Sequence, residues 1–90
     1  MKVPKEGETY EHFKGGKISI VAISRDPDDP NQKYVTYRQV TPGRDYPRGT
    51  KWTRKLEDFC SEKTFLKDIK YGKRKYTEGQ TVQRFKLVPR

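Results

Sequence analysis

The segment Lys51-Trp52-Thr53-Arg54-Lys55-Leu56-Glu57-Asp58-Phe59 contains the only tryptophan of the 90-residue chain and ends in an aromatic residue. Leu56 and Phe59 are three positions apart, so a short helical turn would place both side chains on one face. One tryptophan and one phenylalanine are a large share of the core that a chain of this length can build. We therefore predict a helical turn here, with Leu56 and Phe59 packed below a buried Trp52.

Three segments before this turn have the composition of β-strands. They are Thr9 to Phe13, Lys17 to Arg25, and Gln32 to Val40, each rich in β-branched or aromatic residues. In the second segment the alternation slips between Ile20 and Val21, which indicates either a β-bulge or a strand covered on both faces. The breaker-rich loop from Asp26 to Asn31 predicts antiparallel pairing of the second and third strands.

The remaining segments are less regular. Two prolines and two glycines predict a loop from Thr41 to Thr50. Thr64 to Tyr71 fits either a strand or a helix, and the following Gly72 favours a strand. Gly72 to Gln80 is a polar, basic connector, and Thr81 to Val88 fits a closing strand with Phe85 and Leu87 facing inward. Short strands separated by turn signals indicate a small antiparallel barrel or sandwich, which we expect to be one domain, residues 1–90, with residues 1–8 as a flexible lead-in.

The charge of the chain favours a polyanionic partner. Lys and Arg number 21 against 12 Asp and Glu, giving a formal net charge of +9. Nucleic acids attract such chains because bound cations release counterions from the phosphates. The excess is concentrated in residues 61–90, which carry nine Lys and Arg against three Asp and Glu.

Cys60 is the only cysteine, so the chain cannot form an internal disulfide or a thiolate zinc site. No apolar run is long enough to cross a bilayer, and the first residues contain no signal-peptide core. We expect a cytoplasmic monomer without a membrane partner or a cofactor.

The order of landmarks resembles a small family known as domain of unknown function 1653. The segments that carry the resemblance are Gly7, Tyr10 to Gly15, Val35 to Arg38, Trp52 to Phe59, and Arg84-Phe85. Lys55 stands where the family usually has proline, and three connecting segments look longer than usual. The resemblance implies a single SH3-like antiparallel β-barrel with one short helical turn, and it implies no established activity.

No catalytic constellation is recognisable. His12 is the sole histidine, and the only candidate nucleophile, Cys60, cannot be placed beside it from sequence. Asp26, Asp28 and Asp29 lack the glycine and terminal glutamate of a calcium loop, and prolines interrupt them. We therefore expect a protein that is not an enzyme and has no metal site.

The basic last third contains the principal candidate site. Lysines and arginines with an interleaved tyrosine are the residues that contact phosphates and stack on bases. The candidates for nucleic-acid binding, to DNA or RNA, are Lys67, Lys70, Lys73, Arg74, Lys75 and Tyr76.

A second hypothesis is a protein-interaction module that receives a peptide or an acidic partner surface through exposed aromatics. Its candidate residues are Tyr10, His12, Tyr37 and Tyr46. A third and weaker hypothesis is a small enzyme or ligand-binding protein that uses His12.

Overall fold

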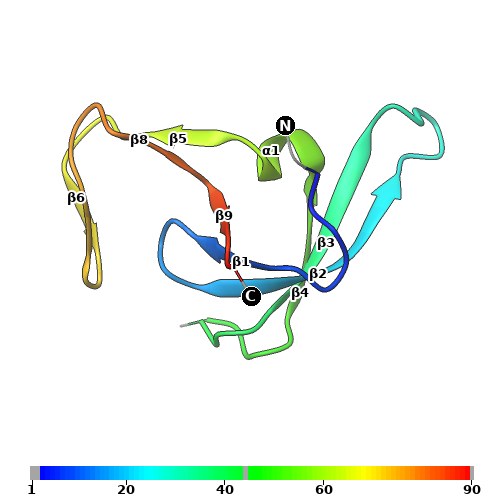
Figure 1. Ribbon diagram of the computed structural model, residues 1–90, viewed down its shortest axis with the longest axis horizontal. Coiled ribbons are helices and arrows are strands. Elements are labelled where there is room, and N and C mark those ends of the chain that lie inside the picture. Colours follow the sequence, from blue (N-terminus) through cyan, green and yellow to red (C-terminus); the bar gives the residue numbers. More distant parts are fainter. Residues whose placement is uncertain (1–2, 44, 90) are drawn as a thin grey trace.

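The computed structural model describes residues 3–43 and 45–89 and shows a mostly β protein (Figure 1). Its elements are β1 (Thr9–His12), β2 (Lys17–Arg25), β3 (Lys33–Gln39), β4 (Lys51–Lys55), α1 (Leu56–Phe59), β5 (Glu62–Thr64), β6 (Ile69–Tyr71), β7 (Arg74–Tyr76), β8 (Thr81–Gln83) and β9 (Phe85–Leu87). The all-β class and the single helical turn are confirmed.

Five strands form one antiparallel sheet in the order β4-β3-β2-β1-β9. The edge strands β4 and β9 do not pair with each other, so the sheet stays open within the described residues. Two smaller two-stranded sheets, β5-β8 and β6-β7, complete the structure. The predicted antiparallel architecture is correct, but strand pairing does not close it into a barrel.

The first three strands follow the sequence pattern. The register of β2 against β3 shifts between Ile20 and Ala22, which confirms a bulge at the slipped alternation. Ile18 and Ile20 are buried on β2, and Val35 and Tyr37 are buried on β3. The sheet therefore presents one apolar face to the rest of the core.

The helical turn α1 covers that face. Leu56 and Phe59 are 8% and 2% exposed, as expected from their spacing. Phe59 stacks on Phe85 with ring centroids 4.2 Å apart and an interplanar angle of 7°. Tyr10 meets the ring of Phe59 edge-on at 5.2 Å. The turn and the last strand thus complete the core together.

The prediction of a buried Trp52 is wrong. Lys51–Lys55 is a strand at the edge of the sheet, so its side chains have neighbours from another strand of the sheet on one side only. Trp52 pairs with Tyr37 across the β3-β4 ladder, yet it remains 38% exposed. The core beside α1 is filled instead by Phe85.

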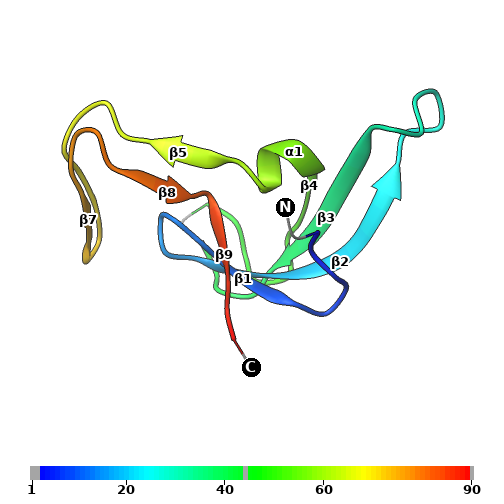
Figure 2. The same cartoon turned by 45° about the horizontal axis from the view of Figure 1, so that its top comes forward.

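Residues 62–83 form a projection that we call the basic arm (Figure 2). β5 and β8 run side by side away from α1, and the β6-β7 hairpin lies at their far end. The expected strand from Thr64 to Tyr71 is therefore two strands, interrupted at 65–68, where Phe65 is buried against Phe13 and Tyr76. The expected connector from Gly72 to Gln80 contains β7, and the closing strand is divided at Arg84 into β8 and β9.

Within the expected lead-in of residues 1–8, Pro4 is buried. The Gly7 N–H donates to the Ile20 carbonyl and the Ile20 N–H donates to the Glu8 carbonyl, both at 2.9 Å. Across residues 3–43 and 45–89, no helix is long and apolar enough to span a membrane.

Burial predicts losses of different size for two aromatic truncations. Phe59→Ala should lower the free energy of unfolding by about 3–5 kcal/mol, which is most of the stability of a small domain. Trp52→Ala should lower it by only about 1 kcal/mol, because the exposed ring makes few buried contacts. Chemical denaturation of both variants checks this prediction, and equal losses would contradict it.

Candidate functional site

A cavity of about 490 Å³ opens between the β1-β2 turn, strands β3 and β4, and the 41–50 loop. We call it the aromatic pocket. Its lining residues are His12, Lys14, Gly15, Gly16, Ile18, Tyr37, Gln39, Thr41, Pro42, Gly43, Tyr46, Trp52, Arg54 and Phe85. The volume lies in the range of roughly 300–1,000 Å³ that is usual for small-ligand sites.

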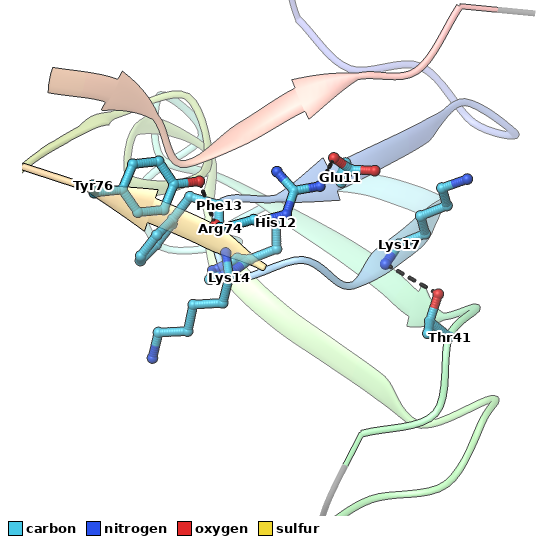
Figure 3. Close-up of polar contacts among 8 residues, drawn as sticks. All are labelled: Glu11, His12, Phe13, Lys14, Lys17, Thr41, Arg74 and Tyr76. Carbon is cyan, nitrogen blue, oxygen red and sulfur yellow. Dashed lines mark hydrogen bonds and ion pairs between the residues drawn. The ribbon is translucent and has the colours of Figure 1, made fainter. Parts of the chain in front are cut away.

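Two exposed rings form the mouth of the pocket. Tyr46 and Trp52 meet edge-to-face with centroids 5.0 Å apart, and they are 36% and 38% exposed. Gly43 makes this placement possible, because a Cβ at that position would lie 2.3 Å from the Tyr46 ring. The Lys17 N–H donates to Thr41 Oγ1 at 3.3 Å, which ties the start of the loop to β2 (Figure 3).

Arg54 supplies positive charge to the wall. It shares a strand face with Trp52 because the two residues are two positions apart on β4. Its guanidinium lies 5.5 Å from the Phe85 ring centroid. Burial raises the pKa of Tyr37, and the nearby Arg54 charge opposes this rise. Among the described residues no carboxylate pairs with it, and none lines the pocket. The wall is therefore suited to a ligand with negative charge or exposed acceptor atoms.

His12 lines the same pocket as a neutral donor. Burial, reinforced by the charges of Lys14, Arg54 and Arg84, lowers the pKa of His12 to about 4. Its Nδ1 accepts the Lys14 N–H at 3.1 Å, so the ring hydrogen is on Nε2. The ring also packs against Phe85 at 4.9 Å. This arrangement positions a donor, and among the described lining residues none is an acid–base partner for His12.

Aromatic packing docks the basic arm against the β1-β2 turn. Phe65 stacks on Tyr76 at 4.5 Å with an interplanar angle of 6°, and Phe13 meets Phe65 and Tyr71 edge-on at 5.8 Å. The Tyr76 hydroxyl donates to the Phe13 carbonyl at 2.6 Å (Figure 3). The hairpin is therefore held in a fixed position rather than extended freely into solvent.

An ion pair between Arg74 and Glu11 adds a second point of attachment (Figure 3). The Arg74 side chain passes 3.4 Å from where a Cβ of Gly15 would lie, and Gly15 has a φ of +112° that other residues rarely adopt. Glu11 and Arg74 are partly exposed, so the pair itself contributes little stability. Its main effect is to orient the hairpin.

The docked hairpin directs its lysines outward. Lys70 and Lys75 are directly opposite each other in the β6-β7 ladder, and both are exposed. Lys67 and Lys73 are exposed at the ends of the hairpin. The Lys14 ammonium lies 5.5 Å from the Tyr71 centroid, and Lys14 also lines the aromatic pocket. Lys14 thus connects the basic hairpin with the pocket.

The candidate residues fall into distinct groups. In the basic set, four lysines face solvent, whereas Arg74 and Tyr76 hold the hairpin in place. Of the aromatic candidates, three line the aromatic pocket: His12, Tyr37 and Tyr46. Tyr10 does not, because it is buried against Phe59 and its hydroxyl donates to Glu8 at 3.4 Å.

Sequence reasoning missed Trp52, Arg54, Gln39 and Phe85 as pocket residues. Alternation within Lys51–Lys55 could have grouped Trp52 with Arg54, had this segment been recognised as a strand. Gln39 could have been noticed as a polar residue on the same face as Val35 and Tyr37 of β3; it is only 6% exposed.

Cys60 is apart from His12. It lines a different cavity, with Tyr10 and Phe59, and burial raises the pKa of its thiol. In the part of the chain that the structure describes, no three His, Cys, Asp or Glu side chains are grouped to hold a metal ion.

The depressed pKa of His12 predicts a loss of stability in acid. Between about pH 6.5 and pH 4 the unfolded chain binds a proton that folded His12 does not, so stability falls as the pH is lowered through this window. The loss of stability from protonating His12 should be on the order of 2 kcal/mol, because partial exposure of the ring reduces the desolvation penalty. His12→Asn keeps an acceptor for the Lys14 N–H and should flatten this part of the stability profile, measured by denaturation at each pH. Parallel profiles for both proteins would contradict the assignment.

Comparison with known proteins gives a family but no function. The model of the family described as "Protein of unknown function (DUF1653)" matches residues 8–87. No curated protein and no solved structure matches the chain. The match covers β1 to β9, including both the aromatic pocket and the basic arm. The chain therefore belongs to the DUF1653 family.

Proposed function

We propose that this protein is a non-catalytic module that binds single-stranded nucleic acid. The observation that carries the proposal is the docked β6-β7 hairpin, which presents Lys70 and Lys75 side by side to solvent. Like charges directly opposite each other in a ladder destabilise it. A polyanion lying along the hairpin would turn this repulsion into attraction.

The opposite end of the molecule offers an instructive contrast (Figure 1). Arg25 and Lys33 are also directly opposite each other, at the end of the β2-β3 hairpin. There, residues 25–33 carry two cations against three carboxylates, whereas residues 67–76 carry five cations against one carboxylate. The β6-β7 hairpin therefore carries more net positive charge than the end of the β2-β3 hairpin.

A single strand suits the surface better than a duplex. Lysines of the hairpin can contact phosphates, and Lys14 continues this positive surface to the aromatic pocket. At the pocket, Tyr46 and Trp52 offer exposed rings on which unpaired bases can stack. The bases of a duplex are already stacked and would not reach these rings.

A binding role agrees with the chemistry around the pocket. His12 is held neutral with its Nδ1 engaged by the backbone, and Cys60 belongs to another cavity. The pocket lining provides donors and ring faces and no paired acid and base.

A protein-interaction module is the second candidate. The observation in its favour is that β4 is an edge strand immediately beside the aromatic pocket. An acidic peptide could add to this edge as a further strand and place a side chain between Tyr46 and Trp52.

Salt dependence of binding tests the first proposal. Lys70→Gln combined with Lys75→Gln should weaken binding to a single-stranded oligonucleotide regardless of its sequence. If both lysines contact phosphates, the slope of log affinity against log salt concentration should decrease by about 1.4, at about 0.7 per contact. Fluorescence anisotropy over a series of salt concentrations measures this slope.

The matched control is Arg25→Gln combined with Lys33→Gln, which removes the same charge at the far end of the molecule. It should leave the slope unchanged. Equal changes of slope in the two double variants would mean that only the net charge of the protein matters. An unchanged slope in the Lys70 and Lys75 variant would exclude the hairpin from the site.

A further inference from the structure

We propose that the aromatic pocket receives one unpaired nucleobase, with guanine preferred, and that Lys14 contacts the adjoining phosphate. This inference rests on the proposed binding of nucleic acid and adds a base-specific subsite to it. The basic arm would supply affinity for the backbone, while the pocket would distinguish one base from another.

The shape of the pocket favours a planar ring. Tyr46 and Trp52 stand edge-to-face at its mouth, and Phe85 forms part of its wall. A base that enters can stack on one exposed ring while its edge points toward Arg54 and His12. The cavity of about 490 Å³ has room for a base, so binding would not require the core to repack.

Lys14, Arg54 and His12 give the polar lining an excess of donors. Arg54 has no carboxylate partner among the described residues, and its guanidinium offers several N–H groups. His12 Nε2 carries the ring hydrogen because Nδ1 accepts the Lys14 N–H. The Gln39 amide lies beside Gly16, where a Cβ would approach its Nε2 to 3.1 Å. These donors need acceptor atoms on the ligand.

Guanine meets that need better than adenine. Its O6 and N7 are adjacent acceptors, and arginine recognises this edge by two parallel hydrogen bonds. Adenine presents an amino donor next to N7, which would face the donors of Arg54 and His12. No carboxylate in the described lining could accept the hydrogen bonds of that amino group, and Gln39, whose amide could pair with adenine, is only 6% exposed.

Chemical-shift titrations of the 90-residue chain with mononucleotides test the inference. Guanosine monophosphate should shift the Trp52 indole and the Gly16 and Arg54 amide signals. It should bind at least about five-fold more tightly than adenosine monophosphate. Equal affinities would overturn the preference for guanine, and identical shifts with inorganic phosphate alone would overturn the base pocket.

Matched variants separate base recognition from charge. Arg54→Lys keeps the charge but loses the two-pronged donor, so the ratio of guanosine to adenosine monophosphate affinity should fall toward one. Arg84→Lys is the control, because Arg84 lies 5.8 Å from the Phe13 centroid and outside the pocket lining. It should leave the ratio unchanged. Trp52→Leu provides a second test and should weaken the binding of both mononucleotides.

Oligonucleotide binding distinguishes failure of the inference from failure of the proposed function. Oligonucleotides could bind with a salt slope that decreases in the Lys70 and Lys75 variant, while mononucleotides do not bind. This result would overturn the base pocket and leave the nucleic-acid function intact. If neither oligonucleotides nor mononucleotides bind, both proposals are overturned. Displacement of guanosine monophosphate by an acidic peptide of higher affinity would assign the pocket to a protein partner instead.

Discussion

The stacked pair of Phe59 and Phe85 is the contact on which the rest of the structure depends. It joins the helical turn after β4 to the last strand of the sheet, so it connects segments at both sides of the basic arm. Phe85 also meets Tyr37 and His12 edge-on, at 5.5 Å and 4.9 Å. The same ring therefore completes the hydrophobic core and forms a wall of the aromatic pocket. Loss of this pair would remove the core and the proposed site together.

Local sequence signals were sufficient for about half of the fold. The strands before residue 40, the bulge after Ile20 and the turn at Leu56–Phe59 all follow from alternation, β-branched composition and spacing. Trp52 was misplaced because its burial depends on the position of β4 within the sheet. No local sequence pattern shows that β4 is an edge strand. The strands of the arm are only three residues long, so their pairing is set by the packing of Phe65 and Tyr76 rather than by their own propensity.

The candidate site was predictable only in its chemistry. The excess of lysines in the last third of the chain was visible, and so was the wealth of tyrosines. Which of them are available for a ligand depends on contacts between residues far apart in sequence. Arg74 pairs with Glu11 and Tyr76 bonds to Phe13, each across 63 positions. These contacts give Arg74 and Tyr76 a structural role in holding the hairpin, whose neighbouring lysines are exposed.

The charges around the aromatic pocket also bear on whether it favours a cationic or an anionic ligand. Pockets lined by several rings commonly bind cations, because the ring faces are electronegative. Here the face of Phe85 is already occupied by the Arg54 guanidinium, and Lys14 adds a second positive charge at the rim. A further cation would meet repulsion from both, with no carboxylate in the described lining to offset it. The remaining exposed faces, those of Tyr46 and Trp52, can stack on a neutral ring, and the two cations attract an anion attached to it. A base that carries a phosphate combines both properties, and so the same electrostatics that exclude a cation support the nucleotide as the ligand.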